Sequence, residues 1–160
     1  MKCTHNPFKI FILFSLLFPA IVFATSFQGT VVKVTDGDTI QVMHNGSAEK
    51  IRLAEIDCPE KKQPYGNAAK KYVLSVAAQK NVTVNVETID RYGRTVGEVI
   101  LPGGNSLNRQ LVSEGYAWHY KKYSKDKSIG DLEAEARIAK RGLWQDKNPI
   151  APWEWRRGKR

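Results

Sequence analysis

Three short stretches of the chain combine acidic and basic side chains in a way that could do chemistry on a phosphate. They are Asp36-Gly37-Asp38-Thr39, then Arg52 with Asp57-Cys58-Pro59-Glu60, and finally Asp90-Arg91-Tyr92-Gly93-Arg94. Each stretch lies where the sequence predicts that a β-strand begins or ends. We therefore expect the fold to bring them together.

The acidic residues predict a site for a hard divalent cation. Asp38 and Asp57 would repel each other at close range unless a cation lay between them. Calcium and magnesium bind carboxylate, carbonyl and water oxygens. The two carboxylates and a main-chain carbonyl beside Asp57 would leave positions for water and for a phosphate oxygen, which the ion would polarise. Asp36 has a simpler interpretation, because an aspartate in an Asp-Gly-Asp turn often bonds only to its own backbone.

The other charged residues suit hydrolysis of a phosphodiester. Glu60 is the candidate base that orients or deprotonates the attacking water. Arg52 and Arg94 are the candidate cations for the charge that grows on the phosphoryl oxygens, because a guanidinium binds two phosphate oxygens and keeps its proton. Arg91 fits a solvated surface charge better.

Aromatic residues alternate with cations in two places, Tyr92 and the stretch from Trp118 to Tyr123. Such a pattern suits stacking on bases together with phosphate contact. Tyr92, Tyr120 and Tyr123 are the candidate substrate-binding residues, whereas Trp118 has the alternative of being a core residue. The basic and aromatic tail, residues 146–160, has two interpretations: packing back on the domain through its tryptophans, or fraying as chain ends do.

The elements that must position these residues form a pattern dominated by strands. Alternating or valine-rich stretches predict five strands near residues 27–34, 39–43, 51–56, 82–86 and 95–101. Asn45-Gly46 predicts a tight hairpin between the second and third strands. Helical spacing predicts three helices: one over 66–79, a short one stopped by Gly115, and one from a Ser128/Asp131 capping box to Gly142. This order predicts an α+β, mainly β fold: a five-stranded OB-fold barrel with three helices.

The charge of the chain favours a polyanionic partner. Its 160 residues carry 25 Lys and Arg against 16 Asp and Glu, a formal net charge of +9. A surplus of this size favours nucleic acid or an anionic membrane surface. A basic membrane-surface protein would need a strongly amphipathic basic helix, which the sequence does not contain.

The first 24 residues are typical of a secretory signal peptide. A positive start precedes a nearly unbroken apolar stretch over residues 10–18, then Pro19 and the small residues that lead to Ala24. We expect cleavage after Ala24 and a secreted or periplasmic protein with no membrane attachment. The alternative is an uncleaved anchor, although a membrane span needs ~20 apolar residues. Cleavage would leave 23 Lys and Arg against 16 Asp and Glu, a net charge of +7.

Cysteine content excludes two kinds of stabilising site. After loss of Cys3 with the signal peptide, Cys58 is alone in the mature chain. A single cysteine cannot close an internal disulfide. Zinc sites built from cysteine and histidine clusters are excluded for the same reason.

Three strings in order resemble the signatures of the staphylococcal nuclease (thermonuclease) family: residues 34–39 (VTDGDT), 51–60 (IRLAEIDCPE) and 90–94 (DRYGR). Weaker matches also occur in the right order, at residues 63–66, 111–117 and 142–144. The resemblance runs from Phe27 to Trp144, nearly the whole mature chain. It implies a nuclease domain over 25–145, between the signal peptide and the tail.

The resemblance implies a calcium-dependent nuclease that hydrolyses DNA and RNA with little sequence preference and typically leaves a 3′-phosphate. It implies calcium ligands at Asp38, Asp57 and the main-chain carbonyl of Cys58. It implies catalytic roles for Arg52, Glu60 and Arg94.

The chain departs from the family pattern at one position of the expected metal site, and an alternative function exists. Cys58 stands where the family often has threonine. Sulfur is a poor calcium ligand, so the thiol is given no metal role. The alternative function is a non-catalytic nucleic-acid-binding module that has lost the catalytic residues, although all five acidic and arginine side chains are present here. We expect a monomer with no stable protein partner.

Overall fold

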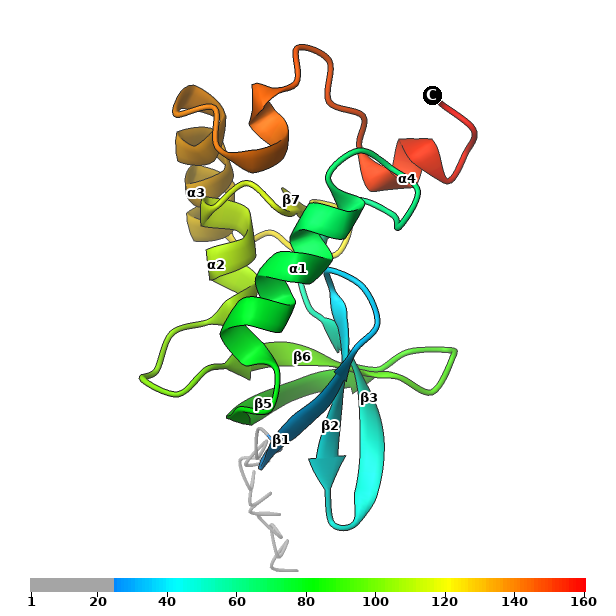
Figure 1. Ribbon diagram of the computed structural model, residues 1–160, viewed down its shortest axis with the longest axis vertical. Coiled ribbons are helices and arrows are strands. Elements are labelled where there is room, and N and C mark those ends of the chain that lie inside the picture. The colour runs from blue at the N-terminus through cyan, green and yellow to red at the C-terminus, as the bar shows by residue number, and fades with distance from the viewer. Residues whose placement is uncertain (1–24) are drawn as a thin grey trace, which may run out of the picture.

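The computed structural model describes residues 25–160, so the predicted signal peptide lies outside the described residues. Strands build a barrel at one end of the molecule and helices gather at the other (Figure 1). In chain order the elements are β1 (Ser26–Val34), β2 (Thr39–His44), β3 (Ser47–Leu53), β4 (Ile56–Asp57), α1 (Gly66–Ala77), β5 (Asn81–Ile89), β6 (Thr95–Ile100), α2 (Leu107–Ser113), β7 (Trp118–His119), α3 (Lys127–Ile138), the 3₁₀ helix η1 (Gly142–Gln145) and α4 (Pro152–Trp155).

Five strands close the barrel in the order β1-β2-β3-β6-β5. Neighbouring strands are antiparallel except β3 and β6, which run parallel over three residue pairs centred on Arg52 and Val96. Asn45 and Gly46 both have positive φ, 47° and 77°, as the predicted tight hairpin requires. The predicted α+β, mainly β, five-stranded barrel of the OB type is confirmed.

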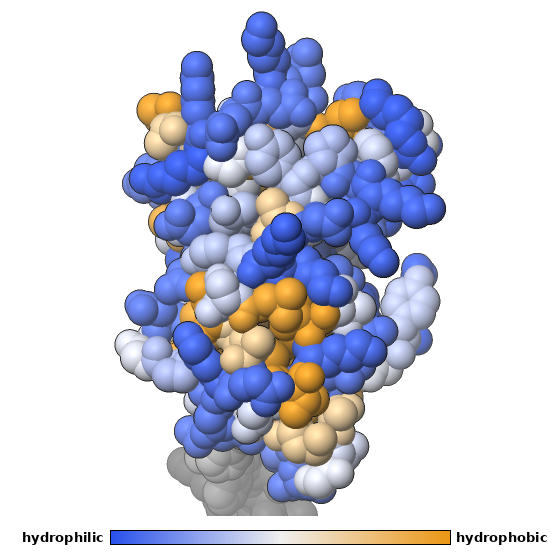
Figure 2. Space-filling model, in the orientation of Figure 1, coloured by the Kyte–Doolittle hydropathy of each residue, from blue (hydrophilic) through white to orange (hydrophobic). Residues whose placement is uncertain are grey.

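One apolar core fills the barrel and continues under α1 and α2. Val82 and Val84 point inward from β5, as their alternation with polar residues predicts. Val73 of α1 and Leu111 of α2 are fully buried in the same core. Hydrophilic residues dominate the upper part of the face in Figure 2, and apolar side chains show through below its middle. Among residues 25–160, no helix is both long and apolar enough to cross a membrane.

Several boundaries differ from the sequence prediction. The third predicted strand is divided, because Glu55 adopts a positive φ of 65° and turns the chain after Leu53. Residues Ile56–Asp57 then form β4, which pairs with β7 instead of continuing in the barrel. The first helix ends at Ala77, two residues earlier than predicted.

The predicted capping box of the last helix is wrong. Asp126 is the N-cap of α3, and its carboxylate accepts a hydrogen bond from the main-chain N–H of Ser128 at 2.8 Å. The helix ends at Ile138, and Gly142 begins the separate 3₁₀ helix η1. The last helix is therefore shifted toward the N-terminus relative to its prediction.

Candidate active site

The turn between β1 and β2 presents Asp38. The Asp36 carboxylate accepts a hydrogen bond from the main-chain N–H of Asp38 at 3.2 Å, which is the local role proposed for Asp36. The carbonyl of Asp38 accepts from the N–H of Leu53 at 2.9 Å, so the turn is attached to β3. The Asp38 carboxylate also accepts from the N–H of Cys58 at 2.8 Å. These bonds hold Asp38 against the chain that carries Asp57.

Gly37 allows this turn to lie close to the rest of the molecule. A Cβ atom at Gly37 would meet the side chains of Ala69 and Cys58 at 2.8 and 2.9 Å. The Cys58 thiol beneath the turn is buried, and this burial raises its pKa well above the ordinary value. The thiol is therefore a protonated packing group beneath the turn.

Arg52 lies between the two aspartates. Its Nη2 atom is 3.2 Å from Oδ2 of Asp38 and 3.0 Å from Oδ1 of Asp57. Its Nη1 atom also donates to the carbonyl of Leu53. Two carboxylates from different parts of the sequence thus flank a single nitrogen atom, and only 3% of the Asp57 side chain is exposed.

Asn108 supports the turn that connects Arg52 with Asp57. This buried amide on α2 donates to the carbonyls of Ala54 and Gly97 at 3.0 and 3.3 Å. Its oxygen accepts from the N–H of Val99 at 3.1 Å. Through Asn108, α2 therefore joins the β3–β4 turn to β6.

Glu60 lies on the loop between β4 and α1. The side-chain oxygen of Gln63 accepts from the main-chain N–H of Glu60 at 3.1 Å. The amide nitrogen of Gln63 donates to the carbonyl of Ile150 at 2.6 Å. One buried glutamine thus connects the loop of the candidate base to the C-terminal tail.

Arg156 of the tail contacts the acidic cluster directly. Its Nη2 atom is 2.7 Å from Oδ2 of Asp57, and its Nη1 atom is 2.6 Å from Oε1 of Glu60. Nη1 also donates to Oδ1 of Asp57 at 3.3 Å. Sequence reasoning missed this residue. The only signal for it was the basic composition of the tail.

The tail reaches the cluster along a row of aromatic rings. Trp153 stacks on Tyr120 with ring centroids 5.2 Å apart and an angle of 2° between the planes. Trp153 also meets the edge of Trp118, and Tyr120 meets the edge of Tyr123. The tail therefore packs back through a tryptophan, which is one of the two interpretations left open by the sequence. The predicted substrate residues Tyr120 and Tyr123 adjoin each other, and Tyr123 is exposed.

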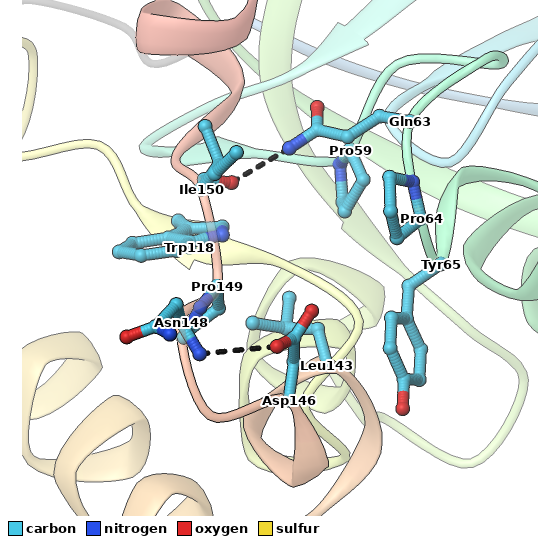
Figure 3. A pocket seen from close by; sticks show the side chains of 10 residues that line it. All are labelled: Pro59, Gln63, Pro64, Tyr65, Trp118, Leu143, Asp146, Asn148, Pro149 and Ile150. Atoms are coloured by element: carbon cyan, nitrogen blue, oxygen red, sulfur yellow. Dashed lines mark hydrogen bonds between the residues drawn. The ribbon is translucent and has the colours of Figure 1, made fainter. Parts of the chain in front are cut away.

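A small pocket lies where the tail crosses the loop before α1 (Figure 3). Pro59 and Gln63 line one side of it and Pro149 and Ile150 another, with the Gln63–Ile150 hydrogen bond across the gap. Trp118 also lines it. The pocket lies at the boundary where the tail packs against the domain. The acidic side chains of the cluster do not line it.

Arg94 is not joined to this cluster. Its Nε atom is 2.7 Å from Oδ2 of Asp90, within the hairpin between β5 and β6 that projects sideways from the barrel (Figure 1). Tyr92 on the same hairpin is exposed, with the guanidiniums of Arg91 and Arg94 over its ring. The structure thus gathers Asp38, Arg52, Asp57 and Glu60, and leaves Arg94 and Tyr92 on a neighbouring exposed loop.

The cluster carries more negative than positive charge. Burial raises the pKa of Asp57, against the lowering effect of its hydrogen bond from Arg156, and the neighbouring Asp38 raises it further. Burial followed by the charge of Asp38 raises the pKa of Asp36 to about 6. Four carboxylates (Asp36, Asp38, Asp57, Glu60) stand against two guanidiniums (Arg52, Arg156), so full ionisation leaves two negative charges.

These residues fit a hard divalent cation as a partial ligand set. The two aspartates supply hard oxygen donors close to one another, and the surplus negative charge matches a divalent ion. Within residues 25–160, no group of three or more His, Cys, Asp or Glu side chains is placed to hold a metal. Calcium takes six to eight oxygens, so such a site would depend on the main chain, water and substrate for the rest.

Comparison with known proteins identifies relatives over most of this chain. The family model described as staphylococcal nuclease homologue matches residues 50–146. An uncharacterized endonuclease of Escherichia coli O157:H7 is 45% identical over 148 residues, which cover 92% of this chain and 95% of the relative. A micrococcal nuclease of Shigella flexneri is 41% identical over 141 residues, which cover 82% of this chain and 81% of the relative.

A plant relative shows the same similarity within a longer protein. A staphylococcal-like nuclease of Arabidopsis thaliana is 43% identical over 111 residues, which cover 69% of this chain and 34% of the plant protein.

Proposed function

Since this chain belongs to the staphylococcal nuclease family, and is therefore a nuclease that hydrolyses phosphodiester bonds, we propose that it cleaves both DNA and RNA in a calcium-dependent reaction at the acidic cluster. The observation that carries this proposal is the position of Arg52, whose Nη2 atom contacts both Asp38 and Asp57. This arrangement places the Arg52 guanidinium beside two carboxylates that can bind a hard metal ion.

Asp38, Asp57 and the main-chain carbonyl of Cys58 would hold the calcium ion. When bound, the ion supplies polarisation of a phosphodiester oxygen and compensates its charge. The buried aspartates fit this role because their mutual repulsion, which contributes to the raised pKa of Asp57, favours a cation between them.

The protein residues would perform the other parts of an in-line displacement. Glu60 accepts a proton from water, or orients that water, for attack on phosphorus. Arg52 is held at the cluster by β3 and stabilises the negative charge that grows on the phosphoryl oxygens. Arg94 would be the second cation, on an exposed hairpin that can meet the substrate as it binds. Tyr92, Tyr120 and Tyr123 would contact bases or sugars beside the cleavage site.

We also propose export of the protein through the segment that ends at Ala24, leaving a nuclease domain over 25–145 and the tail over 146–160. The net charge of +7 that remains on the mature chain would favour binding of nucleic acid by attraction to its phosphates.

The test is cleavage of DNA and of RNA with calcium and with an excess of chelator. Glu60→Ala and Arg52→Lys should each lower the cleavage rate by about 100- to 1000-fold, the usual effect of losing one catalytic group of this kind. Glu135→Ala is the matched control, since this glutamate is exposed on α3. Circular dichroism would establish that each variant is folded.

Full cleavage in chelator, or undiminished cleavage by folded Glu60→Ala protein, would refute the proposed mechanism. Binding of nucleic acid without any cleavage would instead favour the non-catalytic module.

A further inference from the structure

We propose that Arg156 and the divalent cation are alternative occupants of the same acidic cluster, so that the tail keeps the metal-free enzyme closed and the cation must displace Arg156 to bind. This inference rests on the proposed function, because it takes Asp57 as a metal ligand and Glu60 as the base.

The contacts of Arg156 cover the atoms that the reaction needs. Its two terminal nitrogens bond to Oδ2 of Asp57 at 2.7 Å and to Oε1 of Glu60 at 2.6 Å. Arg52 and Arg156 both donate to the other Asp57 oxygen, at 3.0 and 3.3 Å. Both oxygens of Asp57 are therefore bonded to guanidinium groups. A metal ion bound to Asp57 would lie beside at least one guanidinium, and the repulsion between the two cations favours release of a guanidinium.

Arg156 is the guanidinium that leaves more easily. The Arg52 side chain is 14% exposed, lies on a barrel strand and has further bonds to Asp38 and to the carbonyl of Leu53. The Arg156 side chain is 42% exposed and follows a helix of only four residues, α4. The backbone of Arg52 is fixed by the pairing of β3 with β6, whereas Arg156 follows the short helix α4 of the tail.

The rest of the tail can stay in place when Arg156 moves. Ile150 is bonded to Gln63, Ala151 is buried, and Trp153 is stacked on Tyr120. These contacts hold the tail up to residue 153 and bring Arg156 back to the cluster after each release. The exchange therefore needs only a rotation of the Arg156 side chain or a shift of the last turn.

Competition of this kind weakens the apparent affinity for the cation. A ligand that binds only the open form has an apparent dissociation constant equal to its intrinsic value divided by the fraction of open form. Arg156 also contributes a positive charge at the cluster, which opposes a second cation. Removing Arg156 should therefore strengthen calcium binding. If Arg156 served only to bind substrate phosphate, its removal would leave the calcium affinity unchanged.

The experiment is calorimetric titration of the intact protein with calcium chloride, in the absence of nucleic acid. Arg156→Ala should lower the calcium dissociation constant by about three- to fivefold, the upper part of the range expected for a partly exposed charged contact. Arg156→Lys should fall between this variant and the unmodified protein, because an ammonium keeps the charge but cannot bridge both acids.

Arg157→Ala is the matched control for overall charge. Arg157 is exposed and, within residues 25–160, takes part in none of the ion pairs. Its loss should change the calcium dissociation constant by less than about twofold, since exposed charges without a partner are screened. Thermal unfolding provides a second measurement: Arg156→Ala should lower the melting temperature without calcium and not in saturating calcium.

The outcomes separate the inference from the proposed function. Equal calcium affinity of Arg156→Ala and Arg157→Ala would overturn the inference while leaving the calcium-dependent nuclease intact. A fall in cleavage rate by Arg156→Ala at unchanged calcium affinity would overturn it as well, in favour of a phosphate contact. Absence of calcium binding in every variant, the unmodified protein included, would refute the metal site itself.

Discussion

Replacement of Asn108 by alanine should destabilise the protein substantially, although this residue lies outside the acidic cluster. The change removes one acceptor and two donor contacts of a buried amide, to Val99 N–H and to the carbonyls of Ala54 and Gly97. The Gly97 carbonyl keeps its bond from the N–H of Ala54 at 2.8 Å. The Val99 N–H and the Ala54 carbonyl each lose their side-chain partner.

The magnitude follows from these two groups. A buried polar group left without a partner costs about 1–3 kcal/mol, so the expected loss for two groups is about 2–6 kcal/mol in the free energy of unfolding. A domain of this size has only about 5–15 kcal/mol in total. Urea unfolding measured by circular dichroism should therefore show a midpoint lowered by about 1–2 M. Asn105→Ala is the matched control, because that asparagine is exposed on the loop before α2.

Asn108→Asp tests the orientation of the amide. An oxygen would replace the donor nitrogen beside two carbonyl oxygens, so at pH 7 this variant should be less stable than Asn108→Ala. Burial raises the pKa of such a carboxyl above its unfolded value of about 3.9, so the destabilisation should appear as pH rises and shrink toward pH 4. Asn108→Ala within about 0.5 kcal/mol of the unmodified protein would refute the reasoning, since that is the range of neutral surface changes.

Two further predictions concern the turns that carry the acids. Gly37→Ala should lower stability by about 1–3 kcal/mol and weaken calcium binding, because its Cβ would meet Ala69 and Cys58 below 3.0 Å. Thermal unfolding and calcium titration would measure both effects, with Gly130→Ala, which meets nothing closer than 3.5 Å, as the control. Cys58→Ser should keep calcium-dependent DNA cleavage, because the assigned ligand is the main-chain carbonyl. An inactive but correctly folded Cys58→Ser protein would contradict that assignment.

Short-range signals predicted most of the barrel. The Asn45-Gly46 hairpin and the alternation of Val82 and Val84 depend on neighbouring residues alone, and both are confirmed. The division of the third strand could not be predicted in this way. Its cause is a positive φ at Glu55. The sequence has no glycine or asparagine at this position to indicate a positive φ. The pairing of β4 with β7 stabilises that conformation through contacts between residues that are far apart in the sequence.

The acidic cluster was predictable to the extent that its residues lie in recognisable strings. The chemistry of Asp38, Asp57 and Arg52 suggested a shared site, and the structure brings these three side chains together. Arg156 was not predictable, because it meets Asp57 across 99 residues of sequence and nothing in its neighbourhood specifies that contact. Such a contact depends on how the whole tail packs.

The parallel pairing of β3 with β6 also determines when, during folding, the site becomes complete. The pairing joins residues 51–53 to residues 95–97, so it closes a loop of chain that contains β4, α1 and β5. Contacts between distant parts of a chain carry a loop-closure cost and tend to form late. Arg52 lies in the middle of this pairing. We therefore expect the Arg52 guanidinium to reach its position beside Asp38 and Asp57 only late in folding. Hydrolytic competence would then be the last property acquired by the newly made chain.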